Sequence, residues 1–338
     1  MTEQELAELL VGDSAPIRDA RRLILKIAPT GLPVLLQGPT GVGKEVVARA
    51  LHRASNRPGQ FVPFNTCAIP ETLFESELFG HERGAFSGAL DSRVGLLTQA
   101  HRGTAFFDEI STLPSTSQVK LLRAIEEQEY RPLGAKTDCR SDFRVVAASN
   151  VDLHAHAVHG DFRPDLVQRL SGVVIELPPL ASRRADIRVL AERFRREVAI
   201  RVCKQVRFSE AALQILENYE WPGNVRELRL TVERAVLLAD GEVVDNAQLR
   251  TIKHRYDQPA VRRGAVNLIE RQEMLRLLAE EGWDTAALAV RLGTHRATVY
   301  RWMRRLEINL LATGLTRRTH AKVPSLPESR SEDPAERC

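Results

Sequence analysis

Apolar residues in the first 180 positions fall into short runs separated by stretches with helical periodicity. Four of these runs are typical of buried strands, at residues 33–37, 104–108, 143–148 and 173–177. The first run is followed by a glycine-rich turn and then by a helical pattern over residues 46–54. Buried strands that alternate with helices at this spacing predict a parallel sheet with helices on both faces.

Beyond residue 179 the strand signal ends, and residues 186–202, 209–218 and 225–239 show helical periodicity. Ser209 is typical of a residue at which a helix begins, and Asn224 is expected to cap the helix that follows it. We therefore predict a small helical domain, followed by a polar linker at residues 251–265.

The pattern beyond the linker predicts a second, smaller helical unit. Residues 267–281 fit an amphipathic helix, Asp284 can cap a helix at 285–292, and Gly293 allows a turn before a helix at 295–306. Two short helices joined by a glycine turn are typical of a helix-turn-helix. Val299, Trp302 and Leu306 are expected to form its core, and a disordered tail is predicted from residue 311 onward.

Composition narrows the function classes only slightly. The chain has 338 residues and a net charge of +4, which is too small to indicate nucleic-acid binding by itself. No apolar run approaches the roughly 18 residues of a transmembrane helix, and residues 1–10 resemble neither a signal nor a transit peptide. The four widely spaced cysteines predict neither a disulfide scaffold nor a zinc site, so we expect a reduced, cytoplasmic protein.

A glycine-rich segment after the first predicted strand has the composition of a phosphate-binding loop. Glycines let backbone N–H groups converge on phosphate oxygens, the following helix adds its positive end, and Lys44 would neutralise terminal phosphates. Glu45 stands where Ser or Thr usually offers a hydroxyl to Mg²⁺, and the alternative is a turn without a ligand. The candidate nucleotide-binding residues are Gly38, Pro39, Thr40, Gly41, Val42, Gly43, Lys44 and Glu45.

The second predicted strand ends in the acidic pair Asp108 and Glu109. Asp108 is placed to hold Mg²⁺, and Glu109 is placed to orient or deprotonate an attacking water. An acidic pair alone is more often a solvated surface feature. Together with Lys44 on a sister strand it predicts hydrolysis of ATP, with Mg²⁺ as cofactor.

Residues 77–89 read ELFGHERGAFSGA and resemble the signature loop of the AAA+ activators of sigma-54 RNA polymerase. In that family the loop contacts sigma-54 under nucleotide control, and its usual Thr is replaced here by Ser87. Two glycines give the loop backbone freedom, and an exposed Phe86 suits a contact better than a core. The predicted sigma-54 contact residues are Gly84, Ala85, Phe86, Ser87, Gly88 and Ala89.

The resemblance, which covers residues 10–250, implies roles for further side chains. Asn65 resembles the switch residue that holds the catalytic Glu109 away until the γ-phosphate arrives, and Asn150 resembles the sensor I residue. Arg163 and Arg169 resemble arginines that reach the nucleotide of a neighbouring subunit, which implies a ring, usually a hexamer. Arg226 resembles the sensor II arginine of the helical lid.

The resemblance also sets the expected organisation of the chain. The fold class is an α/β P-loop AAA+ domain with a helical lid, plus an all-α Fis-type helix-turn-helix. Its predicted parts are a short segment 1–12, the α/β subdomain 13–180, the lid 181–250, the linker 251–265, the DNA-binding domain 266–310 and the tail 311–338. Departures from the family are Ala181 and Ser182 at the start of the lid and Leu230 further along it. Many relatives carry an N-terminal sensory domain, so control here is expected from a separate inhibitor or co-activator protein.

Arginines gather at the end of the predicted helix-turn-helix. Residues 291–305 contain five arginines and no acid, as phosphate binding requires. His295, Arg296, Thr298 and Arg301 are expected to face bases, and Arg304 and Arg305 phosphates. The alternative is a basic solvated helix.

Taken with the resemblance, the sequence implies a sigma-54-dependent activator that binds upstream DNA, forms a ring and uses ATP hydrolysis to remodel the closed polymerase–promoter complex. Two alternatives remain at this point. One is a DNA-binding AAA+ regulator uncoupled from sigma-54, and the other is a AAA+ remodeller of another protein target.

Overall fold

The computed structural model describes residues 1–249, 271–281, 283–292, 299 and 302–303, and the chain divides into two compact units, Met1–Asp257 and Gln258–Cys338. No helix in these described ranges is long and apolar enough to cross a membrane.

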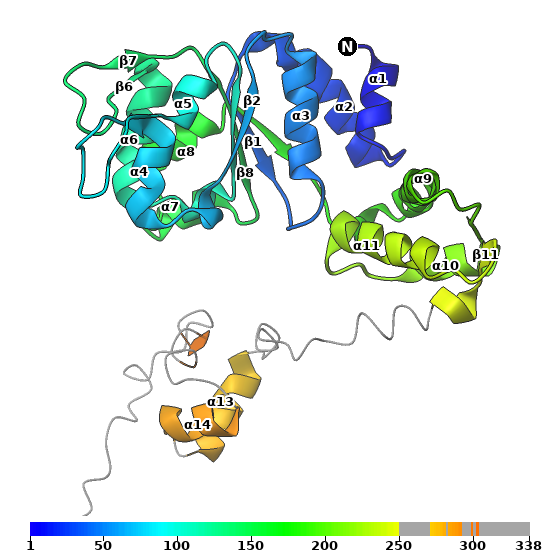
Figure 1. Ribbon diagram of the computed structural model, residues 1–338. Helices are drawn as coiled ribbons and strands as arrows, with labels where there is room; N and C mark the ends of the chain where they lie inside the picture. The colour runs from blue at the N-terminus through cyan, green and yellow to red at the C-terminus, as the bar shows by residue number, and fades with distance from the viewer. Residues whose placement is uncertain (250–270, 282, 293–298, 300–301, 304–338) are drawn as a thin grey trace, which may run out of the picture. The chain divides into compact units, whose positions relative to one another are not determined.

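A five-stranded sheet forms the centre of the first unit (Figure 1), and all of its strand pairs are parallel. Its strands, in spatial order, are β2 (Phe61–Asn65), β5 (Thr104–Asp108), β8 (Arg144–Ser149), β1 (Val34–Gln37) and β9 (Val173–Glu176). Because the strands are parallel, their carboxyl ends lie along one edge, and every loop that leaves this edge can contribute to one site.

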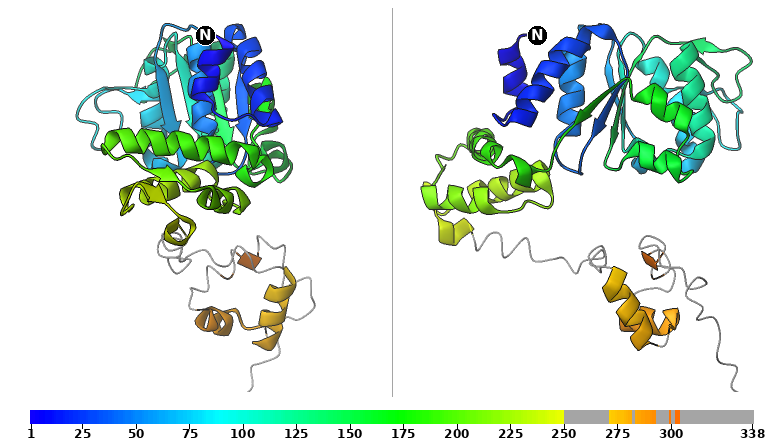
Figure 2. Two further views of the ribbon diagram at one scale, coloured as in Figure 1. Left: turned by 90° about the vertical axis from the view of Figure 1, so that its right-hand side faces the viewer. Right: turned by 180° about the vertical axis from the view of Figure 1, so that it is seen from behind.

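Helices cover both faces of the sheet (Figure 2). On one face lie α1 (Glu3–Leu9), α2 (Ala15–Ile27) and α3 (Lys44–Ala54). On the other lie α4 (Glu71–Phe79), α5 (Leu96–Gln99), α6 (Ser115–Glu127), α7 (Leu153–Val158) and α8 (Pro164–Leu170). Successive side chains of β8 alternate between the two cores, so Val145 packs on the α4–α8 side and Val146 on the α1–α3 side.

The four strands predicted from apolar runs are confirmed as β1, β5, β8 and β9 to within one residue at each end. The sequence pattern did not reveal β2, whose run is interrupted by Pro63. β2 is an edge strand of the sheet, which is where a proline costs no ladder hydrogen bond.

The helical domain consists of α9 (Ala185–Arg201), α10 (Glu210–Asn218) and α11 (Asn224–Leu237) around their own core. The Ser209 hydroxyl accepts a hydrogen bond from the Ala212 N–H and caps α10 as predicted. The structure adds a feature that helical periodicity missed, the two-residue parallel strands β10 (Arg207–Phe208) and β11 (Val243–Val244).

The predicted cap at Asn224 is wrong. Gly223 is the N-cap residue of α11, and Asn224 itself has φ 53°. The Asn224 side chain is buried and is bonded to two other segments. Its Oδ1 accepts from the Leu180 N–H at 2.8 Å, and its Nδ2 donates to the Thr40 carbonyl at 3.0 Å.

In the second unit, α13 (Arg271–Glu280) and α14 (Thr285–Arg291) confirm the first two predicted helices. Asp284 caps α14, since its Oδ1 accepts from the Ala286 N–H at 2.7 Å. Val299 is fully buried in the core of this unit and Trp302 packs against it, as predicted. The linker, the tail, Leu306 and the nominated DNA-contacting residues lie outside the described residues.

Arg144, the first residue of the central strand β8, is a buried cation that has no carboxylate partner among the residues that the structure describes. Its guanidinium donates to the carbonyls of Ile27, Ala28 and Leu32 at 3.1, 2.8 and 3.2 Å. The side chain therefore ties the end of α2 and the turn before β1 to β8. Burial lowers the pKa of Arg144 to about 10, so it remains charged at neutral pH.

Replacing Arg144 by Leu should lower the free energy of unfolding by about 2–4 kcal/mol, because the buried carbonyls of Ile27 and Ala28 lose their donor and the part-buried carbonyl of Leu32 loses one too. Urea unfolding monitored by circular dichroism measures the change. Arg140→Leu, at an exposed arginine on β7 (Cys139–Arg140), is the matched control and should leave the urea midpoint unchanged. Equal midpoints for the two variants would contradict the structural role of Arg144.

Candidate functional site

The loop between β1 and α3 forms a cradle of backbone N–H groups that requires glycine. Gly38, Gly41 and Gly43 have φ of 151°, 81° and 110°. A Cβ on Gly38 would lie 2.3 Å from the Leu177 carbonyl oxygen, and one on Gly41 would lie 2.5 Å from the Gly223 carbonyl oxygen. Gly43 is also the N-cap residue of α3, so the positive end of that helix faces the loop.

Lys44 is the cation of this cradle. Its residue is 6 % exposed, and its Nζ donates to the carbonyls of Gly38 at 2.7 Å and Pro39 at 3.4 Å. Burial lowers the pKa of Lys44, and the nearby carboxylates of Glu109 and Asp108 oppose that shift. Backbone carbonyl oxygens thus take the place of water around the ammonium. An anion that binds in the cradle would be attracted to a positive charge that water screens only weakly.

Polar side chains from three neighbouring strands meet beside this cradle. Asn65 ends β2 and pairs in register with Asp108 at the end of β5, while Asn150 follows β8. The Nδ2 of Asn150 donates to the Thr40 hydroxyl at 3.4 Å. Parallel strand topology therefore brings together residues that are 85 positions apart in the chain.

Glu109 occupies a strained position at the end of β5. It has φ 55°, a conformation that costs a non-glycine residue about 1–3 kcal/mol. The Thr66 hydroxyl donates to the Glu109 carbonyl at 2.5 Å, and the Thr112 N–H donates to the same carbonyl at 3.0 Å. Burial raises the pKa of Glu109, Lys44 opposes this, and Asp108 adds to it. A carboxylate with a raised pKa is suited to accept a proton.

The predicted contact between the switch asparagine and the catalytic glutamate is not present in this state. The Asn65 Oδ1 accepts from the Cys67 N–H at 3.0 Å, and no hydrogen bond joins Asn65 to Glu109 in the described part of the chain. The switch role of Asn65 stays a prediction.

A cavity of about 290 Å³ opens at this edge of the sheet, with walls from both the α/β part and the lid. Its lining residues include Thr40, Gly41, Gly43, Lys44, Glu45, Asp108, Glu109 and Arg226. Most of the residues predicted for nucleotide binding and hydrolysis are therefore brought together. Phe194 and Arg229 of the lid also line the cavity and were not predicted from the sequence.

The lid is joined to the cradle by backbone and side-chain hydrogen bonds. The Arg226 N–H donates to the Gly41 carbonyl at 3.2 Å, next to the Asn224 bond to Thr40. Arg183, which is buried, donates through Nη2 to the Val42 carbonyl at 2.8 Å. A ligand that reshapes the cradle would therefore also displace the 3₁₀ helix Leu180–Arg183 and α11 of the lid.

Asp186 adds a third lid contact that the sequence did not reveal. It is fully buried and accepts hydrogen bonds from the Asp13 and Ser14 N–H groups at 2.7 and 2.8 Å and from the Ser14 hydroxyl at 2.6 Å. A Cβ on Gly12 would lie 2.7 Å from its carboxyl carbon. The three-residue spacing from Arg183 equally fits an exposed ion pair, so nothing in the sequence signalled burial.

The two nominated arginines lie away from the cavity of their own chain. Arg163, which precedes α8, and Arg169, which lies in α8, are both exposed, and neither lines the cavity. The Arg163 guanidinium forms two hydrogen bonds with Asp165, at 3.1 and 2.7 Å. Within this chain, therefore, neither arginine is part of the site.

The glycine–alanine–phenylalanine loop projects between the antiparallel strands β3 (Gly80–His81) and β4 (Arg93–Val94). Phe86 is 39 % exposed, and its ring lies 5.1 Å from the His81 ring between centroids. The Gly84 N–H donates to the Ala89 carbonyl at 2.9 Å and closes the loop. The phenylalanine is exposed, as the sequence predicted.

A second hairpin supports the base of this loop. It is formed by β6 (Glu129–Tyr130) and β7, and its Leu133 exchanges backbone hydrogen bonds with Gly80 and Glu82, both at 2.9 Å. Gly134 passes so close to Ala85 that a Cβ on it would lie 2.9 Å from the Ala85 methyl. The base of the loop therefore cannot shift relative to the hairpin unless these contacts are broken.

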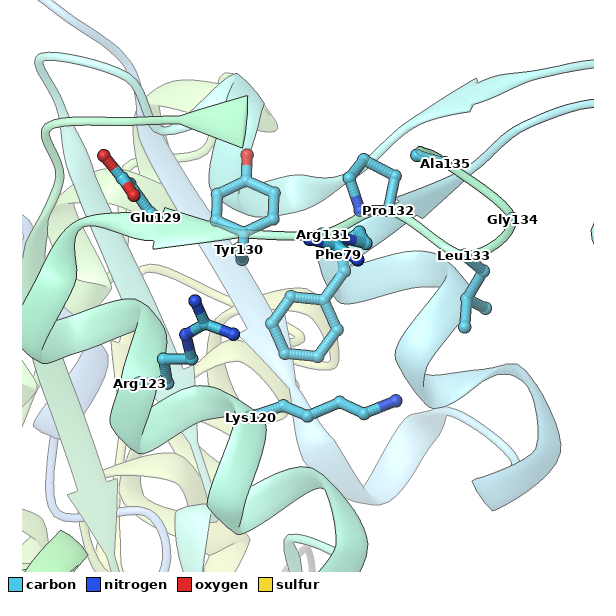
Figure 3. Close-up of a pocket in the computed structure, with 10 residues that line it drawn as sticks. All are labelled: Phe79, Lys120, Arg123, Glu129, Tyr130, Arg131, Pro132, Leu133, Gly134 and Ala135. Carbon is cyan, nitrogen blue, oxygen red and sulfur yellow. The ribbon is translucent and has the colours of Figure 1, made fainter. Parts of the chain in front are cut away.

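A cavity of about 370 Å³ lies behind this hairpin (Figure 3), between α6 and β6. Lys120 and Arg123 line it from α6, and Arg131 lines it from the strand side. Each of these cations is paired with a carboxylate, of Glu75, Glu127 and Asp138 respectively, at 2.7–2.8 Å. The charges of these three cations are therefore balanced by neighbouring carboxylates of the same chain.

Comparisons with known proteins agree with this architecture. Residues 10–176 match the model of the sigma-54 interaction domain, 181–263 that of the AAA+ ATPase lid domain, and 265–315 that of a homeodomain-like domain. The response regulator protein PilR of Pseudomonas aeruginosa is 40% identical over 308 residues, which are 86% of this chain and 68% of PilR. The Nif-specific regulatory protein of Enterobacter agglomerans is 37% identical over 315 residues, 90% of this chain and 61% of that protein.

Solved structures of NtrX from Brucella abortus are also similar. The complex with ADP aligns with a TM-score of 0.66 at 29% identity, covering 90% of this chain and 71% of NtrX. The complex with ATP aligns with a TM-score of 0.65 at 30% identity, covering 90% and 72%.

The cradle, the acidic edge and the lid define a P-loop ATPase of the AAA+ class. The signature loop and the extent of the match to PilR place it more narrowly: the chain belongs to the family of sigma-54-dependent transcriptional activators, with a helix-turn-helix type domain at its carboxyl end. The Fis-type assignment and the domain boundaries stay predictions.

Lys44→Ala should weaken ATP binding by about 100-fold or more, because the cradle loses the desolvated ammonium that would face the phosphates. Isothermal titration calorimetry with ATP measures the dissociation constant. Lys26→Ala, at an exposed lysine of α2, is the control and should bind ATP normally. Ordinary affinity in Lys44→Ala would refute the assignment of the cradle.

Glu109→Gln should stabilise the fold at pH 7. The folded-state pKa of Glu109 is raised above 4.5, so the folded chain binds more protons than the unfolded chain between pH 4.5 and that pKa, and stability falls as pH rises through this window. The neutral amide avoids this penalty.

Urea unfolding at pH 7 and near pH 4.5 measures the effect, and the advantage of the variant should shrink at the lower pH. Glu126→Gln, at an exposed position of α6, is the matched control and should show no pH-dependent difference. A Glu109→Gln advantage that is absent at pH 7, or equal at both pH values, would contradict the burial of this carboxylate.

Proposed function

We propose that the protein assembles into a ring, binds DNA upstream of a promoter and hydrolyses ATP to drive its Phe86 loop against the sigma-54 polymerase. The observation that carries this proposal is the direct chain path from the nucleotide edge to the loop. Asn65 and Glu109 stand at that edge, and the segments that follow them lead to the two hairpins that meet at Leu133.

The residues at the edge fit a complex of ATP with Mg²⁺. The glycine cradle and Lys44 would hold the phosphates, Asp108 would hold the metal, and Mg²⁺ would neutralise charge on the phosphate oxygens. Glu109 would orient a water and take its proton, and its raised pKa suits that task. Arg226 would approach from the lid.

An arginine from a neighbouring subunit would complete the site. Arg163 and Arg169 are exposed and lie outside their own cavity, which suits side chains that act on the next nucleotide in a ring. A guanidinium supplied in this way stabilises the charge that develops during phosphoryl transfer. In this proposal the ring is a hexamer, the usual form in the family.

Coupling to the loop follows from two packed paths. From Asn65 the chain runs through a 3₁₀ turn (Thr66–Ala68) and α4 to β3, and from Glu109 it runs through a second 3₁₀ turn (Ile110–Thr112) and α6 to the β6–β7 hairpin. The Thr66 hydroxyl joins both paths, since it bonds the Glu109 carbonyl at 2.5 Å and lies 2.7 Å from the Thr112 hydroxyl. A shift at Glu109 would therefore reach both sides of the loop base.

DNA binding is assigned to the carboxyl-terminal unit. The homeodomain-like match and the two described helices support a helix-turn-helix. We propose base contacts by His295, Arg296, Thr298 and Arg301 and phosphate contacts by Arg304 and Arg305. A separate inhibitor or co-activator protein would supply control.

Phe86→Ala should leave ATP hydrolysis essentially unchanged while lowering activation by about 30-fold or more, because an aromatic anchor is lost from the contact. The measurement is open-complex formation by sigma-54 polymerase in vitro, with ATPase rates determined in parallel. Val158→Ala, at an exposed apolar residue of α7, is the control and should activate normally. Normal activation by Phe86→Ala would refute the coupling and favour a regulator uncoupled from sigma-54.

A further inference from the structure

A buried glutamine connects the hydrolytic edge of the sheet to the helix that carries Arg163. Gln118 lies in α6 and is 2 % exposed. Its Nε2 donates to the Leu113 carbonyl at 3.0 Å, and its Oε1 accepts from the Arg163 N–H at 2.8 Å. A single amide group thus bonds two segments that are 50 positions apart.

The two backbone groups that Gln118 bonds belong to the segment after Glu109 and to the residue that precedes α8. Leu113 ends the 3₁₀ turn that follows Glu109, and its N–H bonds back to the Ile110 carbonyl. Arg163 is the N-cap residue of α8, so its N–H lies outside the helical hydrogen-bond pattern, where the amide of Gln118 satisfies it. The segment after the catalytic carboxylate and the backbone of the nominated arginine are therefore held at a fixed distance by one side chain.

The side chain of Arg163 is held less firmly than its backbone. Its ion pair with Asp165 leaves both side chains 46% exposed, and exposed pairs of this kind contribute little to stability. The hydrogen bond from the Arg163 N–H to the buried Gln118 fixes the position of the Arg163 backbone. That position determines how far the guanidinium can reach toward the nucleotide of a neighbouring subunit. A displacement of about 1 Å at such a group can cost 100-fold in rate.

We propose that Gln118 is a positioning residue that sets the Arg163 finger according to the state of its own subunit's Glu109 segment, and so links one site of the ring to the next. The inference rests on the proposed function, because it requires that Arg163 acts on a neighbouring subunit. It assigns to α6 a second task besides carrying the β6–β7 hairpin.

Gln118→Leu removes both hydrogen bonds and should lower kcat for ATP by about 10- to 100-fold while leaving KM near the wild-type value. The matched control is Gln128→Leu at the other end of α6. Gln128 also joins two backbone groups, since it donates to the Ile125 carbonyl at 3.3 Å and accepts from the Phe143 N–H at 2.9 Å, yet neither of these groups belongs to α8 or to the segment after Glu109. Gln128→Leu should keep the wild-type kcat.

Subunit mixing separates a misplaced finger from a damaged site. Glu109→Gln subunits cannot hydrolyse ATP but keep intact fingers. Mixed with them before nucleotide is added, Gln118→Leu subunits should regain hydrolysis, because their intact sites then face correctly placed fingers. Arg163→Ala subunits are the reference and should be rescued to the same degree. If Gln118→Leu does not yield folded protein, Gln118→Met is tested by the same criteria.

Rescue of Arg163→Ala without rescue of the Gln118 variant would overturn the inference and leave the proposed function intact. So would a higher KM with unchanged kcat, or an equal loss in Gln128→Leu. If Arg163→Ala itself is not rescued, sites are not shared between subunits through this arginine, and the proposed function fails together with the inference.

Discussion

The parallel arrangement of five strands is the constraint on which the rest of the molecule depends. It places Asn65, Asp108 and Asn150 along one edge and sets them beside the cradle that follows β1. No short segment of sequence could assemble these groups, since each comes from a different strand. The same edge is where the backbone is strained at Glu109 and where the lid is bonded through Asn224. The candidate hydrolytic residues and the bonds that hold the lid therefore lie at the same edge of the sheet.

Hydrogen bonds connect this edge of the sheet to segments that lie elsewhere in the domain. Thr66 joins the ends of β2 and β5, Gln118 joins the segment after Glu109 to α8, and Arg183 joins the cradle to the lid. Each is a buried or part-buried bond whose loss leaves polar groups unpaired, which makes the connections costly to break. Small changes at the edge are therefore expected to be passed on as shifts of whole helices rather than absorbed locally.

The sequence predicted those features that local pattern determines. Apolar runs located β1, β5, β8 and β9, glycines and Lys44 located the cradle, and the motif around Phe86 located the loop. The sequence did not predict features whose position or burial depends on tertiary contacts. Pro63 concealed β2, whose place at the sheet edge is a property of topology. Asn224 is a residue type that often caps a helix, yet its side chain is bonded to Leu180 and Thr40. Arg144, Asp186 and Gln118 are polar residues whose burial no local pattern signals.

The most direct test of the central claim is a binding measurement between the purified protein and sigma-54 in the presence of ADP and a metal fluoride, which together mimic ATP during hydrolysis. We predict that the two proteins co-migrate on gel filtration as a complex of ring size, and that they separate when ADP alone is present. Nucleotide binding without any co-migration, or a particle that stays monomeric in every ligand state, would contradict the claim.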